Sequence, residues 1–224
     1  MKKLTLPPVL IFAITQNAEM RLEQLRQYSM KFETLLTEEA ESIAEQAKEV
    51  GEKLLDLEGE DYMDEYEFDH WQVTTVFPEV LRNSLFVSLY SLLENYLNTL
   101  CGMFFRENDV AVELADLTGT GIFRAEAYLS KVVGMPFPTG PTWDKVLNFN
   151  RLRNTIVHAE GRVGPNSPKK LVNYVKHHPS LSVDSGHRLA LGDEFVDDAI
   201  SVIETVVDSI EAVLQSDHRD PNGL

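Results

Sequence analysis

Apolar residues recur at helical spacing over an unusually long stretch near the amino terminus, and this pattern limits the fold more than any other feature. Gaps of three, four and seven residues place them on one face of an α-helix. At 1.5 Å per residue that helix would be about 60 Å long, so we expect it to pack along a partner or to break near Gly51. The pattern spans residues 17–57 and consists of Leu22, Leu25, Phe32, Leu36, Ile43, Val50, Leu54 and Leu57.

The segment before this helix has some features of a secretory signal. Three residues, Met1-Lys2-Lys3, precede an apolar run over residues 4–14, but Pro7-Pro8 interrupts the run and no small-residue cleavage site follows. We therefore predict a short strand over residues 9–14, docked on the body of a cytoplasmic protein. No other apolar run approaches the length that a transmembrane helix needs, and no membrane partner is expected.

Residues 56–69 are strongly acidic, with eight carboxylates among fourteen residues. Such a run usually marks a solvated linker, and this is the interpretation that we favour. The alternative is an autoinhibitory segment that mimics RNA, with carboxylates in place of phosphates and Tyr62, Tyr66 and Phe68 in place of bases. The chain then divides into residues 1–70 (strand, long helix and acidic linker), 71–217 (a helical domain) and 218–224 (a tail).

The remaining pattern predicts a mostly α-helical fold, an up-and-down helical bundle with one small β-hairpin. Pro78 suits the first turn of a helix, Thr142 and Asp193 suit N-caps, and Gly161 suits a helix end. Turn residues 184–186 separate two short β-like runs, which predicts a hairpin near residues 181–191. The predicted helices cover residues 78–105, 109–117, 122–133, 142–160 and 169–176, and a last one begins at Asp193.

Charge is distributed unevenly along the chain. The net charge of −16 repels polyphosphate at long range, so any RNA-directed activity needs a local basic site. Residues 143–178 provide one, because seven basic residues against Asp144 and Glu160 give this stretch +5 and leave −21 for the rest. The alternative is that helix ends and loops simply accumulated basic residues. The seven are Lys145, Arg151, Arg153, Arg162, Lys169, Lys170 and Lys176.

One motif lies within this basic stretch, Arg151-Leu-Arg153-Asn154-Thr-Ile-Val-His158. It resembles the signature of the HEPN superfamily, an arginine followed after four to six residues by a histidine, often with a polar residue directly after the arginine. Arg153 and His158 match the four-residue spacing, and Arg151 and His158 match the six-residue spacing. A helix over residues 89–100 before the motif, and a hairpin and terminal helix after it, extend the likeness to about residues 75–215. The resemblance implies a HEPN-type helical bundle that acts as a homodimer.

Helical geometry tests whether the motif residues can cooperate. At 100° per residue Arg151, Asn154 and His158 lie on one stripe, whereas Arg153 is about 140° from His158 around the helix axis. Arg153 therefore cannot lie beside the histidine of its own chain. A two-fold axis through this helix would bring each arginine near the histidine of a second copy, and this favours a composite site at a homodimer axis.

RNA cleavage through the 2′-hydroxyl needs a base, an acid and cations around the phosphorane. Histidine can supply both proton transfers near neutral pH, and arginine suits the phosphorane oxygens. We therefore predict Arg153, Asn154 and His158 as catalytic residues, although His158 alone would suit a cation at a helix carboxyl end. Glu94 is expected to support the site by pairing with a motif arginine, or else to bond locally to Tyr90 or Asn98. The predicted RNA-binding residues are Arg151, Lys145, Arg162, Lys169 and Lys170.

No metal or cofactor is expected in this site. The single cysteine, Cys101, excludes an internal disulfide and a zinc site built on several thiolates. Two functions remain open. The first is a metal-independent endoribonuclease acting as a toxin or antiviral-defence effector. The second is a catalytically silent HEPN dimer serving as a scaffold or regulatory partner of an antitoxin or a nucleotidyltransferase-type protein. A third, less favoured, is an interaction module that docks through the long first helix.

Overall fold

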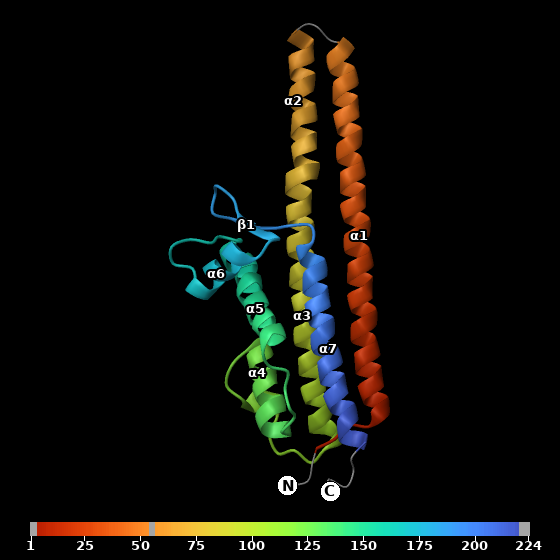
Figure 1. The fold of residues 1–224 in the computed structure, drawn as a ribbon, viewed down its shortest axis with the longest axis vertical. Helices are drawn as coiled ribbons and strands as arrows, with labels where there is room; N and C mark the ends of the chain where they lie inside the picture. The colour runs from red at the N-terminus through yellow and green to blue at the C-terminus, as the bar shows by residue number, and fades with distance from the viewer. Residues whose placement is uncertain (1–3, 54–56, 220–224) are drawn as a thin grey trace.

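The first helix is the longest element of the fold. The computed structural model describes residues 4–53 and 57–219, and α1 spans Pro8–Lys53 (Figure 1). The predicted strand over residues 9–14 is wrong, because this segment forms the start of α1. Pro8 suits the first helical position, and the buried Ile11, Ile14 and Ala18 extend the helical spacing backwards from Leu22.

The acidic segment is also helical, so the linker interpretation is wrong. Helix α2 (Leu57–Trp71) continues through the π-helical turn η1 (Gln72–Val76) into α3 (Phe77–Glu107). Figure 1 shows α1 and this second column side by side, running in opposite directions. Glutamate is a good helix former, and packing along α1 adds the tertiary contacts that an isolated acidic helix lacks. The idea that the segment mimics RNA stays a prediction.

Helix α3 is the centre of the core. It packs against α1, α4 (Gly121–Ala127), α5 (Pro141–Ala159) and α7 (Phe195–Arg219). Three buried rings join α3, α5 and α7: Phe86 lies edge-to-face with Phe149 and Phe195, at centroid distances of 5.6 and 5.3 Å. One continuous core contains these rings together with Ile11, Ile14, Ala18 and Leu22 of α1. The fold is thus the predicted mostly α-helical bundle with a long first helix.

The region between α3 and α5 agrees only in part with the expected helices. The predicted helix over residues 122–133 is confirmed as α4 and the π-helical turn η3 (Tyr128–Val133). The predicted helix over residues 109–117 is wrong, because only the 3-10 turn η2 (Leu114–Asp116) forms and none of its residues is buried. Thr142 is not the cap of α5 either; Gly140 precedes the helix with φ 86°.

The small β element lies where it was predicted. Helix α6 (Lys169–His177) leads to β1 (Leu181–Val183), which pairs antiparallel with β2 (Leu189–Leu191) so that Leu181 lies opposite Leu191. Helix α7 includes residues 218 and 219, so the predicted tail begins inside a helix and its last residues lie outside the described part. The division of the chain at residue 70 stays a prediction. Within residues 4–53 and 57–219, no helix combines the length and apolar character needed to cross a membrane.

Candidate functional site

Helix α5 carries the motif and is fixed by its buried face. Trp143, Val146, Phe149 and Leu152 point into the core, with Ile156 partly buried behind them. The helix ends as expected, because Glu160 and Gly161 both adopt positive φ, and the Gly161 amide donates to the Thr155 carbonyl at 3.0 Å. This end is a left-handed cap of the kind that glycine favours. The motif residues are thereby presented around a rigid helix.

Arg153 lies against α3. Its guanidinium carbon is 5.9 Å from the centre of the Tyr90 ring, and its Nη1 donates to Asn154 Oδ1 at 3.0 Å. The side chain is half-buried, and its Nε atom is buried without a hydrogen-bond partner. No carboxylate of the described residues lies within ion-pair distance of this guanidinium. An aromatic face and an amide thus hold Arg153 in place while its positive charge stays uncompensated.

Asn150 and Tyr90 also belong to this arrangement, and neither was predicted as a site residue. Asn150 Nδ2 donates to the Tyr90 hydroxyl at 2.6 Å, and Asn154 Nδ2 donates to Asn150 Oδ1 at 3.3 Å. Burial raises the pKa of the Tyr90 hydroxyl, so it stays protonated at neutral pH. The spacing of four between Asn150 and Asn154 was visible in the sequence. Their link to Tyr90, sixty residues earlier, was not.

His158 lies in the last turn of α5 and is exposed. It makes no hydrogen bond or ion pair with any residue that the structure describes. Five positions separate it from Arg153, or about 7.5 Å along the helix axis. The imidazole is therefore open to solvent or to a second molecule, while the alternative of a cation at a helix carboxyl end also fits this position.

Arg151 points to a different neighbour from Arg153. Its Nη1 donates to Asn148 Oδ1 at 2.7 Å, and its side chain lines a hollow of about 350 Å³ between α5 and α6. Lys170 lines the same hollow, together with Asp144 and Tyr174. The structure therefore brings two of the predicted RNA-binding cations together, on the α6 side of the motif helix.

The other predicted binding residues lie apart from that pair. Lys145 lines a second hollow of about 280 Å³, which adjoins the first through Tyr174. Arg162 is exposed beside the hairpin, where its Nε is 4.0 Å from Glu160 Oε2, and Lys169 is exposed at the start of α6. The basic stretch is thus spread around α5 and α6 and does not form one cleft within a single chain.

Glu94 lies on α3, one turn after Tyr90, and is half-buried. Among the described residues it forms neither an ion pair with a motif arginine nor a hydrogen bond to Tyr90 or Asn98. A Cβ placed on Gly121 would lie 3.2 Å from Glu94 Oε1, and Gly121 has φ 57°. Glycine at position 121 therefore leaves room for this carboxylate. Its supporting role stays a prediction.

In the part of the chain that the structure describes, no three His, Cys, Asp or Glu side chains gather closely enough to hold a metal ion. No family model, curated protein or solved structure matches the chain. The HEPN resemblance therefore rests on the motif and its surroundings, and it stays a prediction.

Proposed function

We propose that the protein is a metal-independent endoribonuclease of HEPN type that acts in the cytoplasm as a toxin or antiviral-defence effector. The observation that carries the proposal is Arg153, an arginine held against Tyr90 and Asn154 with no carboxylate partner among the described residues. A preorganised and uncompensated guanidinium suits the charge that builds up on a phosphorane. The exposed His158 on the same helix supplies the proton-transfer group.

In the proposed reaction the 2′-oxygen of one nucleotide attacks its own 3′-phosphate. One imidazole takes the proton from the 2′-hydroxyl, and an imidazolium gives a proton to the departing 5′-oxygen as the P–O5′ bond breaks. The products are a 2′,3′-cyclic phosphate and a 5′-hydroxyl. The two roles need two histidines, whereas the motif supplies one per chain. A homodimer with both copies of His158 near its axis meets this need.

Two measurements test the proposal. Purified protein should cleave single-stranded RNA in excess EDTA, and the fragments should carry cyclic phosphate ends. The His158→Ala protein, purified identically, controls for contaminating ribonuclease. Loss of cleavage on chelation, restored by Mg²⁺ or Mn²⁺, would show different chemistry. Light scattering should give the mass of two chains, and a single-chain mass at every concentration would rule out the shared site.

A silent scaffold is the second candidate, in which a HEPN-type dimer binds an antitoxin or a nucleotidyltransferase-type protein. It is favoured by the spread of basic residues over several places, which gives no single basic cleft within one chain. In that case Arg153 and His158 substitutions would have no RNA cleavage to remove, and their effects would be on partner binding or on stability. RNA cleavage that depends on His158 would exclude it.

A further inference from the structure

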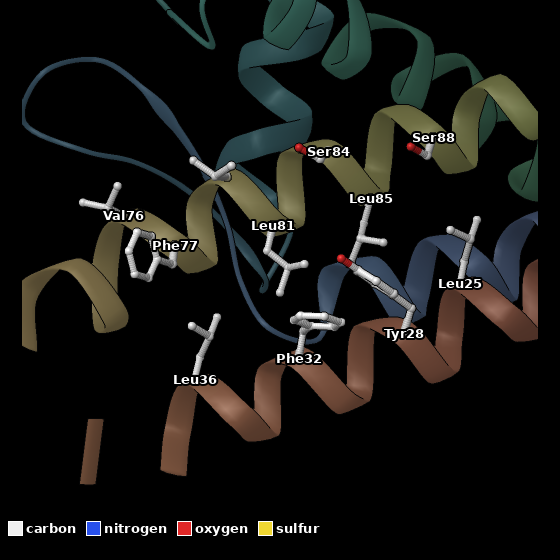
Figure 2. A pocket seen from close by; sticks show the side chains of 11 residues that line it. Leu25, Tyr28, Phe32, Leu36, Val76, Phe77, Leu81, Ser84, Leu85 and Ser88 are labelled. Carbon is white, nitrogen blue, oxygen red and sulfur yellow. The ribbon is translucent and has the colours of Figure 1, made fainter. Parts of the chain in front are cut away.

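An apolar groove between α1 and α3 lies outside the motif region. It has a volume of about 680 Å³, and its lining contains no charged residue. Figure 2 shows side chains from both helices pointing into the space between them. Along α1 the lining positions Leu25, Tyr28, Phe32 and Leu36 follow helical spacing. The groove is therefore a continuous apolar strip and not an isolated gap.

Several lining side chains are exposed to an extent that is unusual for their size. Val80 is 60% exposed, Tyr28 47% and Phe77 44%. Leu35, next to the groove on α1, is 46% exposed. Soluble proteins seldom expose a contiguous apolar surface of this kind unless it binds a partner or a ligand. The lining residues run from Leu25 to Leu36 on α1 and from Val76, at the end of η1, to Ser88 on α3, so the groove is about 16–18 Å long. That length equals about three turns of a helix.

Charge differs between the two ends of the groove. Beyond Leu36, residues 38–49 of α1 carry five glutamates against Lys48, and all of these are exposed. Residues 64–71 of α2 add four exposed carboxylates and no lysine or arginine. At the opposite end, residues 17–26 of α1 carry two glutamates and two arginines, and α7 adds Asp197 and Glu204, which pair with Arg26, and Asp208 and Glu211 near Glu19. Both ends are therefore acidic, and the end beyond Leu36 is the more acidic, with nine exposed carboxylates against Lys48.

We propose that this groove binds an amphipathic helix of another protein whose basic end lies along the acidic α1–α2 hairpin. About three turns of helix, with apolar residues at i, i+4, i+7 and i+11, fit the strip. Lysine or arginine beyond the last apolar residue meets the carboxylates of residues 38–49 and 64–71, and this more acidic end favours one direction of the helix. A second copy of this chain is a poor occupant, because it brings another −16 of charge and its basic residues are spread around α5 and α6 and do not follow a three-turn apolar strip.

The test uses two fluorescein-labelled peptides with the same three-turn apolar pattern. One ends in several lysines, and the other ends in the same number of glutamates. Fluorescence anisotropy with the full-length protein should show saturable binding of the lysine peptide, about tenfold tighter than the glutamate peptide at low salt. The difference should shrink as salt is added, because the charges lie at the surface.

A matched pair of double variants locates the binding surface. Val80→Gln with Tyr28→Gln removes exposed apolar groups from the groove and should weaken the lysine peptide about tenfold. Val9→Gln with Phe12→Gln alters residues that are 69% and 63% exposed on α1, about 20 Å from Leu25, and should leave binding unchanged. All four positions are exposed, so circular dichroism melting should show folded protein in both cases.

Three results would overturn the proposal. Absence of saturable binding, or equal binding of the two peptides, would remove the charged amphipathic helix as occupant. Equal effects of the two double variants would place binding elsewhere. If light scattering showed a dimer that the Val80/Tyr28 variant alone converts to a monomer, the occupant would be a second copy. None of these readouts depends on RNA cleavage, so the proposal that the groove binds a helix can be wrong while the nuclease proposal holds, and the reverse.

Discussion

The guanidinium carbon of Arg153 lies 5.9 Å from the centre of the Tyr90 ring, and the Tyr90 hydroxyl is held in turn by Asn150 at 2.6 Å. Residues of α3 and α5, sixty positions apart, thus fix the orientation of one cation. A ring face attracts the guanidinium without neutralising it, whereas a carboxylate would cancel its charge. This difference separates an arginine that stabilises the fold from one that remains available to a phosphate.

Arg153→Lys should separate the charge of this residue from its shape. Lysine keeps the positive charge but has neither the planar fork nor the stacking surface that the Tyr90 ring receives. We expect RNA binding within a few-fold of the parent and a fall in single-turnover cleavage of about 10²-fold, the usual cost of losing one transition-state donor. Arg106→Lys, at an exposed position in the last turn of α3 and outside the basic stretch, is the control. A fully active Arg153→Lys protein would mean that only charge matters here.

The ion pair of Arg82 with Glu33 should hold α3 to α1. Arg82 Nε and Nη2 donate to the two Glu33 carboxylate oxygens at 2.6 and 2.7 Å, and Nη1 donates to the Leu191 carbonyl at 3.1 Å. The hydrogen bond to Glu33 is the main cause that raises the pKa of Arg82. Arg82→Met should lower the free energy of unfolding by about 1.5–3 kcal/mol, measured by urea titration. A double-mutant cycle with Glu33→Gln that shows no coupling would contradict this.

Helical periodicity was sufficient to predict α3, α5, α6 and α7, because each buries one face in the core. It failed where the local pattern is ambiguous. The short apolar run over residues 9–14 fits a strand or a helix. The helix is identified only by burial, because Ile11 and Ile14 lie on the same buried helical face as Leu22. Residues 56–69 look solvated in isolation. Residues 57–69 are helical because they continue into α3 and pack along α1.

Only the features of the site that lie on the single helix α5 could be predicted from the sequence. The motif spacing identified Arg153, Asn154 and His158, and the i, i+4 relation could have added Asn150. Contacts between distant segments could not be derived from one sequence. The Arg153–Tyr90 contact and the hollow shared by Arg151 and Lys170 both depend on how α3 and α6 pack against α5. Arg151 and Arg153 are only two positions apart, but their side chains leave α5 in different directions. Arg151 lies toward α6, and Arg153 lies against Tyr90 of α3.

Stability should depend on pH through His178. Burial against Tyr174 and Phe195 lowers the pKa of this imidazole, Lys145 lowers it further, and Asp198 acts in the opposite direction. The unfolded chain therefore binds the proton more readily, so stability from His178 is full above the unfolded pKa of about 6.5 and falls as pH drops below it. Melting temperature should fall less between about pH 7 and pH 5 in His178→Gln than in the parent. His177→Gln, at the exposed neighbouring position, should behave like the parent; equal slopes in all three would contradict the assignment.

His158→Ala should separate catalysis from folding. The side chain is exposed and makes no bond to any described residue, so its removal should change the free energy of unfolding by no more than about 0.5 kcal/mol. The substitution leaves the arginines and lysines of residues 143–178 in place, so RNA affinity and its salt dependence should stay close to those of the parent. Proton transfer by a placed side chain is worth about 10²–10⁴-fold in rate, and cleavage should fall by that factor. The measurement is single-turnover cleavage beside thermal melting for His158→Ala and for His177→Ala, the latter being an exposed histidine outside the motif. If His158→Ala cleaves RNA as fast as the His177→Ala control, or melts well below it, His158 is structural and the scaffold function replaces the nuclease.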